Sequence, residues 1–175
     1  MRKLSFLFIL LITPSVFGQI KTIANQELPT SSGVFFEASM DQSISQITMT
    51  ITGPSDRWFG VGFGTTMIGG DVLVYTDGKA GAMHAIDAWD YGLTTESAIG
   101  VTKDAQQDWT IVSNTVAIST RTIVATRSLS TGDASDYTID YANATIGIIW
   151  AKGNTPNNTL SYHGAANRGN TTLTW

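Results

Sequence analysis

The clearest pattern in the chain is a strict alternation of apolar and hydroxyl side chains over residues 47–52, where isoleucine and methionine take turns with threonine. Successive side chains of a β-strand point to opposite faces, so this alternation predicts a strand with one buried face and one solvent-facing face. Further short apolar runs repeat along the chain. They cover residues 34–38, 58–63, 72–75, 83–89, 109–112, 116–126, 146–151 and 171–175.

Turn-forming residues separate these runs at short intervals. Residues 53–56 and 153–156 combine glycine and proline with polar residues, which is typical of loops. Asp77-Gly78 lies between two strand-like runs and favours a hairpin. About nine or ten strands without a helical period predict an all-β fold, an antiparallel β-sandwich of the immunoglobulin-like kind. Residues 19–32 show neither pattern, so we expect a loose lead-in there.

The start of the chain has the pattern of an export signal. Met1-Arg2-Lys3 is followed by an apolar run over residues 4–12 and by small residues up to Gly18. This order predicts a signal peptide at residues 1–18, because the apolar run is shorter than the roughly 20 residues that span a bilayer. We therefore expect a secreted, periplasmic or otherwise extracellular protein. It would have no membrane span after cleavage, and residues 33–175 would form one domain.

Charge and cysteine content narrow the classes of function. The formal net charge is −4, and loss of Arg2 and Lys3 with the signal makes it more negative. An acidic protein surface argues against nucleic acid as a partner. The chain has no cysteine, which excludes thioether-linked haem, iron–sulfur clusters and cysteine-ligated zinc. A haem in this chain would therefore be held non-covalently.

Three stretches, taken in order, resemble the DOMON family. Residues 58–71 combine an aromatic strand, a glycine-rich bend, Met67 and a Gly-x-Asp sequence that opens the next strand. Residues 121–153 resemble the later strands of that family. Tyr162-His163-Gly164 and Arg168-Gly169 then precede a final strand. Together with residues 106–109 in the middle of the domain, the resemblance covers residues 33–175.

This resemblance implies a β-sandwich that binds haem or sugar. In the cytochrome members of the family one methionine and one histidine ligate the haem iron, and Met67 and His163 match these positions. A thioether and a neutral imidazole fill both axial positions, raise the reduction potential and leave no open site for oxygen. We therefore expect a b-type haem, held non-covalently between Met67 and His163, that exchanges electrons with an unknown redox donor and acceptor.

Neighbouring residues would complete the haem pocket. Trp58, Phe59, Phe63 and Tyr162 are expected to wall it with apolar surface, and Arg168 is expected to pair with a propionate. The glycines expected to let the backbone lie against the flat macrocycle are Gly62, Gly64, Gly69 and Gly70. Each assignment has a structural alternative, because methionines and aromatic rings more often fill cores, and histidines and arginines more often lie at surfaces. His84 is the rival donor.

No catalytic constellation stands out. The sequence lacks G-x-S-x-G and H-E-x-x-H motifs, so we predict an electron-transfer or ligand-binding domain rather than an enzyme. The alternative function is a carbohydrate-binding or adhesive module without haem. Its candidate aromatic platforms for a glycan are Trp89, Tyr91, Trp109 and Trp175. Asp133 and Asp136 lack the spacing of an EF-hand calcium loop, so we expect a solvated acidic loop there.

Overall fold

The computed structural model describes residues 19–29, 31–67, 70–76, 78–79, 87–93 and 101–175. The expected signal peptide at residues 1–18 and the rival donor His84 lie outside these residues. Across the described part of the chain the regular structure is β-strand. It contains no helix with the length and apolar character needed to cross a membrane.

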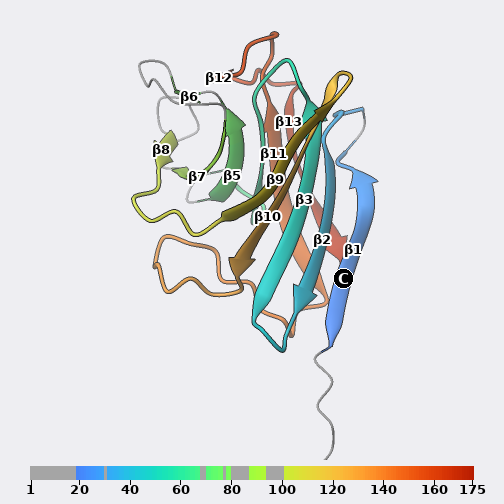
Figure 1. Cartoon of the computed structure of the whole chain (residues 1–175), viewed down its shortest axis with the longest axis vertical. Helices are drawn as coiled ribbons and strands as arrows, with labels where there is room; N and C mark the ends of the chain where they lie inside the picture. Colours follow the sequence, from blue (N-terminus) through green and yellow to red (C-terminus); the bar gives the residue numbers. More distant parts are fainter. Residues whose placement is uncertain (1–18, 30, 68–69, 77, 80–86, 94–100) are drawn as a thin grey trace, which may run out of the picture.

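Two antiparallel sheets pack face to face (Figure 1). In spatial order, the five-stranded sheet consists of β1 (Ile20–Glu27), β2 (Phe35–Asp41), β3 (Gln46–Pro54), β10 (Thr120–Ser128) and β9 (Thr110–Ala117). The six-stranded sheet consists of β13 (Arg168–Thr174), β11 (Thr145–Lys152), β4 (Phe59–Phe63), β5 (Asp71–Thr76), β7 (Asp87–Leu93) and β8 (Val101–Lys103). A short parallel pair joins β6 (Gly78–Lys79) to β12 (Thr159–Leu160). The predicted all-β antiparallel sandwich is confirmed.

Strand alternation explains the position of the core. On β3 the side chains of Ile47, Met49 and Ile51 are buried, whereas the intervening threonines are half-buried. One side of β3 therefore faces the sandwich interior, as the sequence predicts. Strands β4 and β5 differ, because every residue of both is buried. Their second face is covered by a separate apolar cluster that lies outside the main core.

Residues 20–27 differ from the expected loose lead-in, because they form the edge strand β1. This strand pairs antiparallel with β2, from Ile20 opposite Asp41 to Glu27 opposite Phe35, with an irregularity between Ile23 and Gln26. Within β1 only Ile23 is buried. An edge strand with one buried position shows no alternation, so its pairing leaves no signal in the local sequence.

The apolar run at residues 116–126 is two strands rather than one. β9 and β10 pair as a hairpin with Ala117 opposite Thr120, and Ile118 in the turn has a φ of 58°. Isoleucine rarely occupies this left-handed region, so composition does not reveal the turn. The two strands on either side of Asp77-Gly78 do pair antiparallel, with Thr76 of β5 opposite Asp87 of β7. Asp77 itself lies outside the described residues, and Gly78 pairs with Thr159 of β12.

Candidate ligand pocket on the outer face of the six-stranded sheet

A pocket of about 430 Å³ lies on the face of the six-stranded sheet that points away from the sandwich core, and we call it the outer-face pocket. Two rows of paired residues, each crossing β13, β11, β4 and β5, form its floor. They are Arg168–Ala151–Gly60–Val74 and Asn170–Ile149–Gly62–Val72. Directly paired residues of an antiparallel sheet share a face, so both rows face the pocket. Its volume lies in the range of about 300–1,000 Å³ that is usual for small-molecule and cofactor sites.

Two glycines of β4 make this face hollow. A Cβ atom at Gly62 would lie 2.2 Å from Cγ1 of Val72 and 2.6 Å from the carbonyl oxygen of Asp71. A Cβ atom at Gly60 would lie 2.9 Å from Cγ2 of Val74. The valines of β5 therefore occupy the space that side chains on β4 would need. As a result the bare backbone of β4 is part of the pocket floor.

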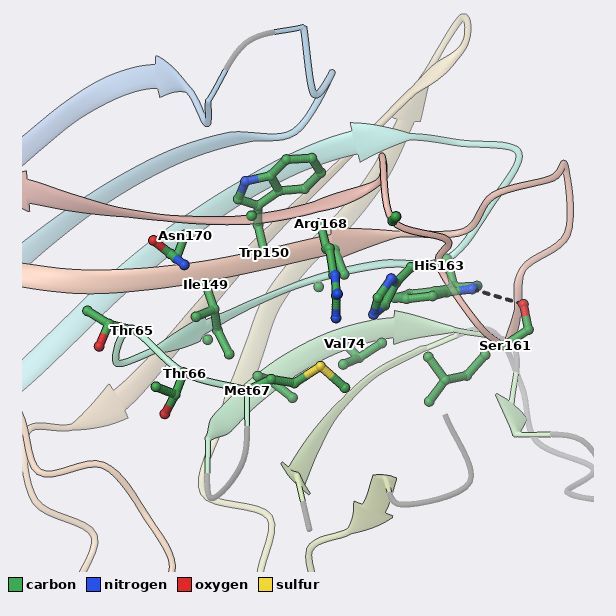
Figure 2. A pocket seen from close by; sticks show the side chains of 18 residues that line it. Thr65, Thr66, Met67, Val74, Ile149, Trp150, Ser161, His163, Arg168 and Asn170 are labelled. Carbon is green, nitrogen blue, oxygen red and sulfur yellow. Dashed lines mark hydrogen bonds between the residues drawn. The ribbon is translucent and has the colours of Figure 1, made fainter. Parts of the chain in front are cut away.

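His163 enters the pocket from the loop between β12 and β13 (Figure 2). Its side chain is buried, and its Nδ1 lies 2.6 Å from the carbonyl oxygen of Gly164. A carbonyl oxygen can only accept a hydrogen bond, so Nδ1 carries the proton and Nε2 keeps its lone pair. Burial lowers the pKa of His163; the Gly164 carbonyl opposes this shift and the charge of Arg168 adds to it. The result is a neutral imidazole whose Nε2 lone pair is available to bind a ligand or a metal.

Met67 reaches the same pocket from the connection between β4 and β5 (Figure 2). Its side chain is half-buried and packs against the apolar cluster of Trp58, Val72, Val74, Ile149 and Leu160. The amide of Gly70 donates to the Met67 carbonyl at 3.2 Å, which holds Met67 next to the start of β5. A thioether and an imidazole that lie far apart in the sequence thus line one cavity.

Several contacts hold the His163 loop in place. The indole Nε1 of Trp58 donates to Ser161 at 3.3 Å, and the Trp58 and His163 ring centroids are 6.4 Å apart. The Tyr162 ring centroid lies 5.0 Å from that of His163, and Tyr162 is 58% exposed. The Asn167 amide donates to the His163 carbonyl at 2.9 Å. The imidazole therefore lies near one buried aromatic ring and one exposed aromatic ring.

Arg168 is the charged side chain of the pocket. It begins β13 and is exposed, whereas the other lining residues in the described part of the chain are neutral or apolar, apart from His163. In the described part of the chain, no acidic residue lines this pocket. A mainly apolar cavity with a guanidinium at its edge favours a ligand with an apolar body and an anionic group.

The structure places the predicted site residues in three different environments. Trp58, Met67, His163 and Arg168 line the outer-face pocket. Tyr162 lies beside the pocket on the surface. The predicted roles of Phe59 and Phe63 require correction, because both point to the opposite face of β4, into the sandwich core. The Phe63 ring centroid lies 6.1 Å from that of Trp109 there, since alternate residues of a strand face opposite sides.

Sequence reasoning missed several lining residues. They are Gly60, Thr65, Thr66, Val72, Val74, Ile149, Leu160 and Asn170. One usable signal was present, because residues 72–75 are apolar without alternation. A strand that is buried on both faces has a continuous apolar run, and here the second buried face is the wall of the pocket. Of the glycines expected against a macrocycle, Gly62 lines the pocket and Gly69 lies outside the described residues.

The donor set fits haem better than a bare metal ion. Among the described residues no group of three or more histidine, cysteine or acidic side chains could hold a metal. One imidazole and one thioether leave most positions of a protein-bound metal unfilled, whereas a porphyrin supplies four nitrogens in its plane. The apolar walls, the glycine floor and the guanidinium also suit a flat apolar macrocycle with carboxylate groups.

A second group of buried charges lies on the core side of the same sheet. The Arg127 guanidinium, fully buried, donates to Asp71 at 2.6 Å and to the Tyr137 carbonyl at 2.7 Å. Asp136 lies 3.7 Å from Arg127, and its side chain is 2% exposed. The expected solvated loop is therefore wrong for Asp136. Burial, opposed in part by Thr131 and reinforced by Asp71, raises the pKa of Asp136 to about 6.

The structure places two of the four candidate glycan platforms against the core. Trp109 is buried and stacks on Phe63, so its face is not open to a sugar. Trp175 is half-buried and packs against the main core. The backbones of Trp89 and Tyr91 pair with Val74 and Val72, but their side chains lie outside the described part of the structure.

Comparisons with known proteins bear on both fold and family. The family model described as the DOMON domain matches residues 31–153. Among solved structures, a similar fold occurs in the cytochrome b domain of pyranose dehydrogenase from Coprinopsis cinerea, with 14% sequence identity and a TM-score of 0.55. That similarity covers 79% of this chain and 76% of the other, and at this identity it concerns the fold alone. The chain matches no curated protein.

Proposed function

This chain belongs to the DOMON domain family, and we propose that it is an exported electron-transfer domain that binds a b-type haem non-covalently in the outer-face pocket. Met67 and His163 would hold its iron through a thioether sulfur and an imidazole nitrogen. The domain would accept electrons from one redox partner and pass them to another, rather than act as an enzyme. The name of the structural neighbour, a cytochrome b domain, agrees with this proposal.

One observation carries the proposal. Met67 and His163 belong to different loops, yet both side chains line the same cavity. The cavity is lined mainly by apolar residues and glycine backbone, and the two donors are the pair that ligates iron in methionine–histidine cytochromes. A methionine that served only as core packing would not need to share a cavity with a buried imidazole.

The surrounding residues would orient His163, exclude water from the cavity and neutralise a carboxylate of the cofactor. The Gly164 carbonyl holds the Nδ1 proton of His163, fixes the ring orientation and leaves Nε2 free to bind. Val72, Val74 and Ile149 would exclude water from the cavity. Arg168 would neutralise a carboxylate at the pocket edge. When bound, the haem supplies a one-electron couple, and two protein donors leave no vacant iron position for oxygen.

The test is reconstitution of the purified protein with haem, followed by absorption spectroscopy and potentiometry. Wild-type protein should give a low-spin spectrum. Met67→Leu keeps the side-chain volume, removes the sulfur, and should lower the potential and abolish the low-spin signature. His163→Ala should weaken haem binding by roughly tenfold or more. Met49→Leu, in the sandwich core, is the matched control and should keep the wild-type spectrum.

Two outcomes would overturn the proposal. If Met67→Leu and His163→Ala both keep the wild-type spectrum, the axial assignment is wrong. If wild-type protein takes up no haem but binds glycans on an array, the carbohydrate-binding alternative is supported instead.

Export is a separate part of the proposal. Expression in a secreting host followed by N-terminal sequencing should give a mature chain that begins at Gln19. A mature chain that retains residues 1–18 would contradict the predicted signal peptide.

A further inference from the structure

Thr76 lies at the last position of β5, and its side chain is fully buried. Its hydroxyl donates to the carbonyl oxygen of Asn158 at 2.7 Å and accepts from the amide of Leu160 at 3.1 Å. Both partners belong to a segment far along the chain. One hydroxyl group thus bonds to both ends of a three-residue stretch that contains β12.

This stretch leads directly to His163. β12 ends at Leu160, whose side chain belongs to the apolar cluster of the pocket, and the chain then continues through Ser161 to His163. The other end of β5 lies close to Met67, since β5 begins at Asp71 and the Gly70 amide bonds to the Met67 carbonyl. β5 therefore runs from the neighbourhood of Met67 to the hydroxyl that bonds to the histidine segment.

Among the described residues, the other backbone contacts of this segment are few. β12 pairs with β6 over two residues. The Trp58 amide donates to the Asn157 carbonyl at 3.2 Å, which anchors the beginning of the segment rather than its end. The Leu160 amide is buried, so loss of the Thr76 hydroxyl would remove a hydrogen bond inside the protein. Losing a buried hydrogen bond is costly, which favours movement of the segment.

We propose that Thr76 is a positioning residue that sets the separation of His163 and Met67 across the outer-face pocket. The claim that Thr76 places the His163 loop is supported by the two hydrogen bonds of its hydroxyl. The claim that this placement affects cofactor ligation also rests on the proposed haem function. The hydroxyl serves one donor and one acceptor at once, and the β-branch of threonine additionally favours the strand.

The experiment compares three variants of the full chain. Thr76→Val keeps the shape and removes the hydroxyl, and Thr76→Ser keeps the hydroxyl. Thr50→Val makes the same chemical change at a half-buried position on β3 of the other sheet. Two measurements are made: amide hydrogen exchange and His163 ring resonances by NMR on haem-free protein, and the spin state of haem-reconstituted protein.

In haem-free Thr76→Val the Leu160 amide should exchange roughly tenfold faster, and the His163 resonances should shift or broaden. The reconstituted variant should give a mixture of low-spin and high-spin haem. Thr76→Ser should restore both signals, and Thr50→Val should change neither. A fall in melting temperature without any change at His163 or in the spin state would overturn the proposal, because Thr76 would then be merely stabilising.

The two proposals fail in different ways. If wild-type protein takes up no haem while Thr76→Val still loosens His163, the haem function is wrong and the placement of the loop by Thr76 stands. If wild-type protein gives a low-spin spectrum that Thr76→Val leaves unchanged, together with unchanged His163 resonances, the positioning role is wrong and the haem function stands.

Discussion

The two faces of β4, β5 and β11 share one backbone but differ in almost every other respect. The inner face, toward the five-stranded sheet, carries large side chains such as Phe59, Phe63 and Tyr75, all buried in the main core. The outer face carries Gly60 and Gly62 between aliphatic residues and opens into the pocket. Alternate residues of the same strands therefore form either a filled core or a hollow.

The difference shows where a sandwich can place a ligand without weakening its core. The inner face is closed by the second sheet, and even its charges are paired, as in the ion pair of Arg127 with Asp71. In the described part of the chain, the five-stranded sheet covers the inner face only, and the small residues of the outer face leave room for a ligand. Stability should therefore depend mainly on the inner face, and ligand binding on the outer face.

The largest expected effect concerns the buried ion pair on the inner face. Arg127→Met removes the guanidinium and leaves the Asp71 carboxylate buried without its cation, so the free energy of unfolding should fall by about 3–5 kcal/mol. Chemical denaturation measures this. The double variant Arg127→Met with Asp71→Asn should lose less than Arg127→Met alone. An equal or larger loss in the double variant would show that the ion pair is not the source of the effect.

Adjacent isoleucines of β11 give the most direct comparison of the two faces. Ile148 faces the core and is 0% exposed, whereas Ile149 faces the pocket and is 9% exposed. Ile148→Ala should reduce the free energy of unfolding by about 2–5 kcal/mol, because it leaves a cavity in closed packing. Ile149→Ala should cost at least about 1 kcal/mol less, since its site already opens into a hollow. Equal losses would remove the distinction between the faces.

A third variant fills the hollow. Gly62→Ala places a methyl group 2.2 Å from the Val72 side chain and 2.6 Å from the Asp71 carbonyl oxygen, so stability should fall by about 1–3 kcal/mol and ligand uptake should weaken. Adding Val72→Ala should restore part of the stability but not all, because the backbone carbonyl cannot yield. Gly62→Ala with wild-type stability and uptake would show that the bare floor is not required.

The smallest expected effect depends on pH and concerns Asp136, which lies beside the buried ion pair of Arg127 with Asp71. Its pKa is raised from 3.8 to about 6, mainly by burial. The folded state therefore holds the proton more tightly than the unfolded state, and this stabilisation is full below about pH 3.8 and is lost as the pH rises through 6. Asp136→Asn should gain stability relative to wild type between pH 4 and pH 7, on the order of 1 kcal/mol. A difference that stays constant over this range would contradict the raised pKa.

Local sequence was a good guide to the fold wherever burial alternates. The threonine–aliphatic alternation of β3 predicts its pairing face, and the resemblance to the DOMON family is confirmed. It was a poor guide to β1, where one buried residue gives no period, and to Ile118, whose turn has an apolar residue. Phe63 and Asp136 were misplaced for the same reason: residue type indicates neither which face a side chain takes nor what covers it.

The sequence by itself determined that the chain forms strands, that a haem could not be attached through cysteine, and which residues could serve as soft and imidazole donors. Only the tertiary structure decided that the Met67 and His163 side chains share a cavity, while their ligation of iron stays a prediction. It also decided that the floor of this cavity is glycine backbone and that Thr76 bonds to the histidine segment. These relations depend on the register between strands distant in the chain. Register is set by long-range pairing of whole strands, and no local window contains both partners.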